Sequence, residues 1–181
     1  MQNKKKLKGM VVTGVVGVCC WHGCFFPSSM VDLQRGERYT NTNYVIINAL
    51  QDRKDLLWIL LTYDIGCQYC INFIKRVFEE WPDDAELWKH VIRILVPKMH
   101  LYGHKDDCQY SFSLNYAKCV GRTHGEKIET LWVAGKELRG STQEMNEGHR
   151  HDTLSDNHAM GVFRKNQEGH KYLFCELIVL R

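Results

Sequence analysis

The sequence holds 181 residues, of which 44% are hydrophobic and 25% are charged, and its formal net charge is +3. These values fit one ordinary globular domain that is long enough to bury a core. The chain has no internal repeat and no low-complexity segment, and its net charge is too small to indicate nucleic-acid binding by itself.

Eight cysteines are spread unevenly along the chain. A disulfide scaffold is usually a smaller chain with less Leu, Ile and Val for its core. Several of these cysteines lie close to histidines in the sequence. We therefore expect reduced thiols, some of which bind a metal.

The amino-terminal region resembles a targeting signal. Residues 1–9 form a basic tail, and residues 10–20 have the length and composition of a signal-peptide core. No small-x-small cleavage site follows, because the next residue is Trp21, and the β-branched residues also suit a strand. We expect a strand rather than secretion. A secreted cysteine-rich protein remains an alternative.

The segment that follows is predicted to be irregular and then helical. Residues 25–29 include a proline and two serines and are expected to break the chain, and residues 31–39 are polar and loop-like. Asn41 or Thr42 is a suitable cap for a helix that ends near Leu50.

The most informative stretch is an unbroken apolar run from Leu56 to Leu61, which is too short to cross a membrane. Such a run predicts the central strand of an α/β sheet, buried on both faces. Asp64 then follows the carboxyl end of that strand, where open α/β sheets bind ligands. An amphipathic helix is expected from Tyr69 to Trp81. Asp64 is thus a candidate functional residue or, alternatively, a helix cap.

Further elements follow in the second half of the chain. A helix near Leu87 leads into a strand over Val91–Val96, which Pro97 stops. Another helix is predicted over residues 126–138, and residues 173–180 form a strand-like apolar run.

Two carboxylates mark the start of the helix over residues 126–138. At about 100° per residue, Glu129 borders the apolar stripe of this helix, whereas Glu126 points nearly opposite. Asp64 and Glu129, brought together, suit Mg²⁺ or Mn²⁺, which prefer oxygen ligands. The alternative is structural: Glu126 stabilises the helix dipole, and Glu129 is a solvated edge residue.

Two groups of Cys and His are candidate zinc ligands. They are Cys19, His22 and Cys24, and His100, His104 and Cys108. Members of the second group recur at every fourth residue, so on one helix they share a face, and Zn²⁺ accepts such nitrogen and sulfur ligands. Neither group has the spacing of a standard zinc finger. Cys67-x-x-Cys70 also stands at a strand-to-helix junction, where a redox motif is the weaker alternative.

Several runs together resemble a known family. They are Thr13-Gly14-Val15-Val16 to Cys19-x-x-His22-x-Cys24, residues 31–39, Tyr63-Asp64-Ile65-Gly66-Cys67-Gln68-Tyr69, Val96-Pro97-Lys98-Met99-His100-Leu101 to His104-Lys105-Asp106-Asp107-Cys108-Gln109, Gly121-Arg122-Thr123-His124-Gly125-Glu126 to Glu129-Thr130-Leu131-Trp132, and Ser141-Thr142-Gln143-Glu144-Met145. In order and approximate spacing, over residues 10–160, these runs resemble the Kyakuja–Dileera–Zisupton (KDZ) transposases of eukaryotic DNA transposons.

The resemblance implies a ribonuclease H-like core that uses Asp, Asp and Glu with a divalent metal to cut and join DNA. Asp64 matches the second carboxylate, and Glu129 or Glu126 matches the Glu. The first Asp belongs to a strand that is expected upstream of residue 10. Asp32 lies in a different motif and is a poor substitute.

The expected fold is therefore α/β, a ribonuclease H-like mixed sheet flanked by helices and missing its first strand. Residues 10–160 would form a partial KDZ domain, and residues 161–181 a divergent segment. His124 stands where the family usually has Asp, and Trp21 replaces a common Arg.

By resemblance, the chain is expected to be transposase-derived, to act on DNA (transposon ends) in the nucleus, and to be catalytically incomplete. Mg²⁺ or Mn²⁺ would be its cofactor, with a structural Zn²⁺ in addition. We expect no membrane association, and an oligomer is a candidate assembly. The alternative is a non-catalytic DNA- or protein-binding module that zinc stabilises.

Overall fold

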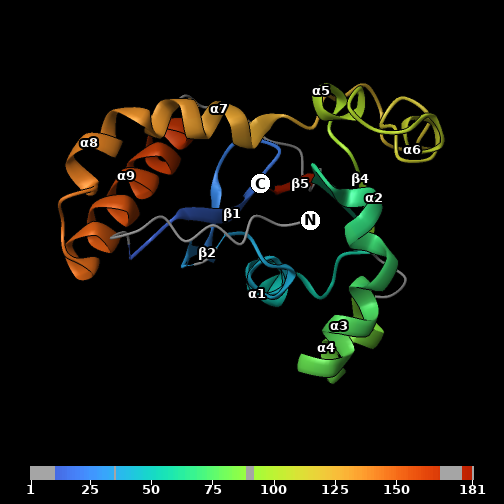
Figure 1. Ribbon diagram of the computed structural model, residues 1–181, viewed down its shortest axis with the longest axis horizontal. Helices are drawn as coiled ribbons and strands as arrows, with labels where there is room; N and C mark the ends of the chain where they lie inside the picture. The colour runs from blue at the N-terminus through green and yellow to red at the C-terminus, as the bar shows by residue number, and fades with distance from the viewer. Residues whose placement is uncertain (1–10, 35, 89–91, 168–176, 181) are drawn as a thin grey trace.

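The structure is a computed structural model that describes residues 11–34, 36–88, 92–167 and 177–180. The basic tail expected over residues 1–9 lies outside the described residues. The described elements form a mixed α/β fold, with helices on both faces of one sheet (Figure 1). This confirms the predicted α/β class.

The sheet has five strands in the order β2-β1-β5-β3-β4. The strands are β1 Gly14–Cys20, β2 Phe25–Leu33, β3 Ile59–Tyr63, β4 Ile92–Leu95 and β5 Leu177–Leu180. β1 runs antiparallel to β2 and β5, whereas β3 runs parallel to β4 and β5. The sheet therefore has an antiparallel side and a parallel side, and β5 joins them.

β5 comes after all the other described elements in sequence, yet it lies in the centre of the sheet. Its register pairs Leu180 with Val18 of β1 and Ile178 with Leu61 of β3. Residues 177–180 thus link the two halves of the sheet. The sequence pattern predicted a strand-like run over residues 173–180, but it placed that run in a divergent segment outside the KDZ domain.

The helices cover the two faces of the sheet unequally. They are α1 Tyr39–Leu50, α2 Gly66–Tyr69, α3 Phe73–Glu80, α4 Pro82–Trp88, α5 Lys98–Leu101, α6 Asp106–Ser111, α7 Lys127–Ala134, α8 Arg139–Thr142 and α9 Glu147–Gln167. Figure 1 shows α1, α3 and α4 on one side of the sheet and α7 along the other.

β3 is buried on both faces, as its apolar sequence predicts. Leu61 and Tyr63 belong to the larger core, with α1 and α3, while Leu60 belongs to the smaller core beneath Ile128 of α7. This division follows from the alternation of side chains along a strand. The strand begins at Ile59 rather than Leu56, and Leu57 is 94% exposed.

The predicted loop over residues 25–39 is wrong in its first part, because β2 occupies Phe25–Leu33. β2 is an edge strand that pairs with β1 alone among the described strands. Its polar Asp32 contacts Arg150 and His151 of α9, so this side chain lies on the face of β2 that α9 covers. An interrupted apolar pattern is compatible with an edge position that a helix partly covers.

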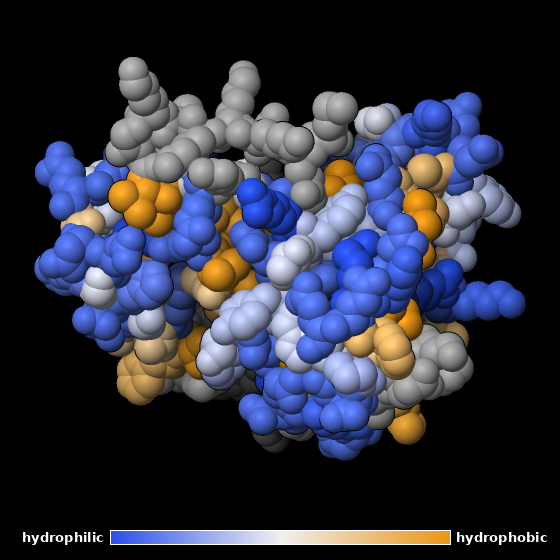
Figure 2. Space-filling view, turned by 60° about the horizontal axis from the view of Figure 1, so that its bottom comes forward, coloured by the Kyte–Doolittle hydropathy of each residue, from blue (hydrophilic) through white to orange (hydrophobic). Residues whose placement is uncertain are grey.

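Most of the surface on the face shown in Figure 2 is hydrophilic, and hydrophobic residues form separate patches on it. The exposed large apolar side chains come from several elements, among them Leu57, Met99, Tyr102 and Phe163. Among the described helices, none is both long and apolar enough to span a membrane.

Two glycines on helices allow an opposed test of packing. A Cβ added at Gly66, at the start of α2, would lie 2.8 Å from the Leu95 carbonyl oxygen, whereas one added at Gly161, in α9, would meet no heavy atom within 4 Å. We expect Gly66→Ala to lower the free energy of unfolding by about 1–3 kcal/mol, because the backbone of β4 must move. Gly161→Ala should raise it by up to about 1 kcal/mol. Urea unfolding followed by circular dichroism measures both; equal effects would contradict the close packing of α2 on β4.

Candidate metal centre

Asp64 is the first residue after β3 and lies at the carboxyl end of the parallel strands. α2 begins at Gly66 with Ile65 in its capping position, so Asp64 precedes the cap rather than forming it. One carboxylate oxygen of Asp64, Oδ1, lies 3.4 Å from Nε2 of His100. Asp64 is therefore one side of a small cluster of charged groups.

Glu126 and Glu129 both reach the same imidazole. Nε2 of His100 lies 3.9 Å from Oε2 of Glu126 and 3.5 Å from Oε1 of Glu129. The other oxygen of Glu126, Oε1, accepts a hydrogen bond from the backbone N–H of Met99 at 2.8 Å. Asp64, Glu126, Glu129 and His100 form what we call the carboxylate cluster, whose side chains are each 15–31% exposed.

Glu126 lies in this cluster although helical periodicity directs it away from Glu129. α7 begins at Lys127, and Glu126 occupies the capping position with φ −103° and ψ 20°. Because Glu126 precedes the regular helix, the 100° rotation per residue does not apply to it. Its bond to Met99 then holds the side chain toward α5.

Gly125 brings the start of α7 close to β3. Its φ is +75°, and its carbonyl oxygen accepts a hydrogen bond from the Thr62 hydroxyl at 3.3 Å. A Cβ at Gly125 would lie 3.0 Å from Leu114 and 3.1 Å from Thr62. Glycine is required here both by the left-handed backbone and by the close approach.

His100, His104 and Cys108 do not lie on one helix, which was the condition for their spacing to place them on one face. α5 ends at Leu101 and α6 begins at Asp106, so a break separates the first histidine from the other two residues. His100 joins the carboxylate cluster, whereas His104 and Cys108 meet Cys67 of α2. Residues that are four positions apart in the sequence therefore belong to two separate clusters.

Cys67, His104 and Cys108 form a second group, which we call the thiol–imidazole cluster. Sγ of Cys67 lies 3.3 Å from Nδ1 of His104, and the three ligand atoms lie within 4.8 Å of one another. All three cysteines nearby, Cys67, Cys70 and Cys108, carry free thiols.

Burial, followed by the hydrogen bond with Cys108, raises the pKa of the Cys67 thiol to about 11. Burial also raises the pKa of Cys70.

Cys67 was not among the ligands expected from the sequence, where only the motif Cys67-x-x-Cys70 drew attention to it. Its partners lie 37 residues or more further along the chain, so no local spacing indicates the contact. Its place just after Asp64, at the carboxyl end of β3, is the signal that was available.

The other predicted group, Cys19, His22 and Cys24, surrounds the turn between β1 and β2. Cys19 is buried in the smaller core, and the backbone N–H of Cys20 donates to the Cys24 carbonyl at 2.8 Å. Within the part of the chain that the structure describes, these three do not share a site with ligand atoms 4.8 Å or less apart.

A family model described as Kyakuja-Dileera-Zisupton transposase (KDZ) matches residues 1–160. The chain belongs to the KDZ transposase family. No curated protein and no solved structure matches the chain.

KDZ membership suggests the use of a divalent metal. Three members of the carboxylate cluster, His100, Glu126 and Glu129, could hold one ion, since their ligand atoms lie within 4.8 Å of one another. Oε2 of Glu126 is buried and forms no hydrogen bond. A buried carboxylate oxygen without a hydrogen bond is costly, and a cation bound beside Glu126 and Glu129 would remove that cost. Oxygen-rich ligands favour Mg²⁺ or Mn²⁺.

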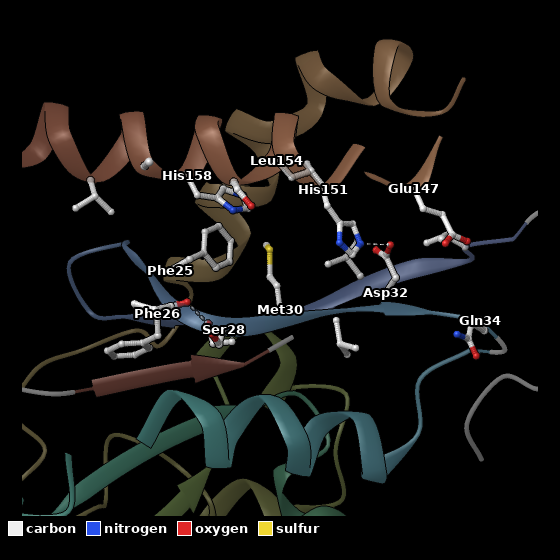
Figure 3. Close-up of a pocket in the computed structure, with 18 of the residues that line it drawn as sticks. Phe25, Phe26, Ser28, Met30, Asp32, Gln34, Glu147, His151, Leu154 and His158 are labelled. Atoms are coloured by element: carbon white, nitrogen blue, oxygen red, sulfur yellow. Dashed lines mark hydrogen bonds and ion pairs between the residues drawn. The ribbon is translucent and has the colours of Figure 1, made fainter. Parts of the chain in front are cut away.

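Asp32 lies on β2, and its side chain contacts residues of α9. Figure 3 shows it in contact with His151 at a cavity between β2 and α9, and His151 Nε2 lies 3.1 Å from its Oδ2. Phe25, Met30 and His158 also line this cavity, whose volume is about 970 Å³. Burial lowers the pKa of His158. Asp32 thus contacts α9 rather than the candidate metal ligands.

Two glycines with positive φ allow a matched test of how the start of α7 is held. Gly125 has φ +75° and close neighbours, whereas Gly121 has φ +68° and nothing within 4 Å of an added Cβ. We expect both alanine variants to lose about 1–2 kcal/mol from the left-handed backbone. Gly125→Ala should lose a further 1–3 kcal/mol or so from the contacts with Leu114 and Thr62. Chemical unfolding of the two variants measures the difference, and equal losses would contradict the tight contact at Gly125.

Proposed function

We propose that this KDZ protein binds a divalent cation at the carboxylate cluster and binds DNA, and that it is incomplete as a transposase. The convergence of Asp64, Glu126 and Glu129 at the carboxyl end of β3 is the observation that carries the proposal. The family match over residues 1–160 supports DNA as the partner and the nucleus as the place of action.

The three carboxylates would hold Mg²⁺ or Mn²⁺ through their oxygens. Such an ion polarises a phosphodiester and lowers the pKa of an attacking water. Glu126 contributes Oε2, since its Oε1 is already engaged by Met99. Nε2 of His100 lies within 4 Å of an oxygen of each of the three acids, so the imidazole holds their side chains toward one point.

We also propose that the fold is ribonuclease H-like, as the family resemblance implies. The mixed sheet with helices on both faces and the carboxylates at its parallel side support this. An additional catalytic Asp beside Asp64 would come from a strand next to β3. The neighbours of β3 are β4 and β5, with the sequences Ile-Arg-Ile-Leu and Leu-Ile-Val-Leu. Neither strand carries an acid, and the next residue in sequence is Val96 after β4 and Arg181 after β5, which supports an incomplete catalytic set.

Basic side chains near the carboxylate cluster support the DNA-binding part. Lys105, Lys118, Arg122 and Lys127 are all exposed, and they belong to the segment that leads through α6 to the start of α7. Lysine and arginine at such positions neutralise backbone phosphates without reading a sequence.

Removal of a proposed ligand should weaken metal binding. We expect Mn²⁺ to stabilise the wild-type protein by about 2.7 kcal/mol when its concentration is one hundred times Kd. Asp64→Asn and Glu129→Gln should each weaken Mn²⁺ binding at least about tenfold. Loss of a residue that only hydrogen-bonds to a metal ligand already has an effect of about this size. Thermal melting and calorimetric titration with Mn²⁺ measure both effects.

Glu137→Gln is the matched control, since Glu137 is an exposed acid in the turn Gly135–Leu138 that follows α7. Its Mn²⁺ affinity should equal that of the wild type. The metal site is disproved if all three variants bind Mn²⁺ as the wild type does.

We expect the protein to bind DNA without cleaving it. The protein is expected to retard duplex DNA in a gel, with an affinity that falls as salt rises. With Mn²⁺ and supercoiled plasmid, it should produce no more nicked or linear DNA than Asp64→Asn does. Strong cleavage that Asp64→Ala abolishes would show that the catalytic set is complete, and absence of retardation at low salt would exclude DNA as the partner.

A further inference from the structure

The thiol–imidazole cluster is distinct from the carboxylate cluster and joins segments that are remote in sequence. Cys67 lies on α2, His104 lies in the connection between α5 and α6, and Cys108 lies on α6. Cys67 is buried, while His104 and Cys108 are partly buried. The group is therefore partly accessible to solvent through His104 and Cys108.

The geometry agrees with that of a tetrahedral zinc centre. Zinc–sulfur bonds of about 2.3 Å and zinc–nitrogen bonds of about 2.0 Å place sulfur and nitrogen ligands about 3.5 Å apart. The distance from Cys67 Sγ to His104 Nδ1 is 3.3 Å, and all three ligand atoms lie within 4.8 Å of one another. One ion can thus contact all three with small side-chain movements.

The composition of the group also selects the ion. Two thiolates and one imidazole are soft ligands, which favour Zn²⁺ over the Mg²⁺ or Mn²⁺ that suits three carboxylates. Three protein ligands and a partly accessible site leave the fourth tetrahedral position to water.

We propose that Cys67, His104 and Cys108 bind a zinc ion that ties the α5–α6 segment to α2. Among the described residues, His104 contacts Cys67 at 3.3 Å, and the Cys108 thiol also forms a hydrogen bond with Cys67. His104 follows α5 by three residues, and α5 carries His100 into the carboxylate cluster. The zinc ion is thereby a positioning element for His100. This inference does not require that the carboxylate cluster bind a metal.

The test uses the full chain, purified without chelator in reducing buffer. We expect about one bound zinc per chain by elemental analysis. X-ray absorption should show two sulfur and two nitrogen or oxygen neighbours around the zinc. Replacement of zinc by Co²⁺ should give a thiolate-to-cobalt charge-transfer band, which a site made of carboxylates and His100 cannot give.

Cys108→Ser and His104→Gln should each reduce the bound zinc at least tenfold, and the Cys108→Ser variant should lose most of the cobalt band. Cys119→Ser is the matched control, because Cys119 is exposed and outside the cluster, and it should retain the full zinc content. Circular dichroism of each variant establishes that it is folded. Should Cys108→Ser alter folding, the sulfur count of the wild-type zinc decides instead.

Three outcomes overturn the proposal. The first is wild-type protein that stays free of zinc after addition of Zn²⁺ under reducing conditions. The second is full zinc content in folded Cys108→Ser and His104→Gln. The third is a zinc environment with three or more sulfurs, or with none, because either would require other ligands.

Discussion

The contact between Thr62 and Gly125 is the constraint on which the arrangement of acids depends. The Thr62 hydroxyl donates to the Gly125 carbonyl, and the absence of a side chain at Gly125 lets the start of α7 approach the end of β3. Glu126 and Glu129 follow at once in sequence, while Asp64 lies two residues beyond Thr62. A hydrogen bond from one buried side chain to one buried backbone carbonyl thus brings together acids from distant parts of the chain. Without this link, repulsion between the like charges of the three carboxylates would favour their separation.

Two clusters with different chemistry meet at the α5–α6 segment. His100 faces three carboxylates, and four residues later His104 faces two thiols. The break between α5 and α6 rotates the second histidine away from the first, so one segment contributes to an oxygen-rich group and to a sulfur-rich group. Hard and soft cations would be sorted by these ligands rather than by separate domains.

Local patterns predicted what depends on local sequence. The apolar run before Asp64 indicated a strand buried on both faces, and the fold contains it at Ile59–Tyr63. β2 was missed because an edge strand need not alternate strictly. Cys67 was missed as a partner of His104 because their contact is made by the tertiary fold. Glu126 was misplaced because a capping residue does not follow helical periodicity. The resemblance to the KDZ family, by contrast, depended on the order of several motifs. That order does not depend on whether each strand or helix is predicted correctly.

The position of β5 has a consequence for how the chain acquires its structure. β1 and β3 both pair with residues 177–180, which come after all the other described elements. During synthesis, therefore, the two halves of the sheet leave the ribosome before the strand that joins them. Until then each half exposes an unpaired strand edge, a surface that favours aggregation. Pairings between such distant residues also slow folding. A nascent chain of this kind would benefit from chaperones that protect strand edges until synthesis reaches β5.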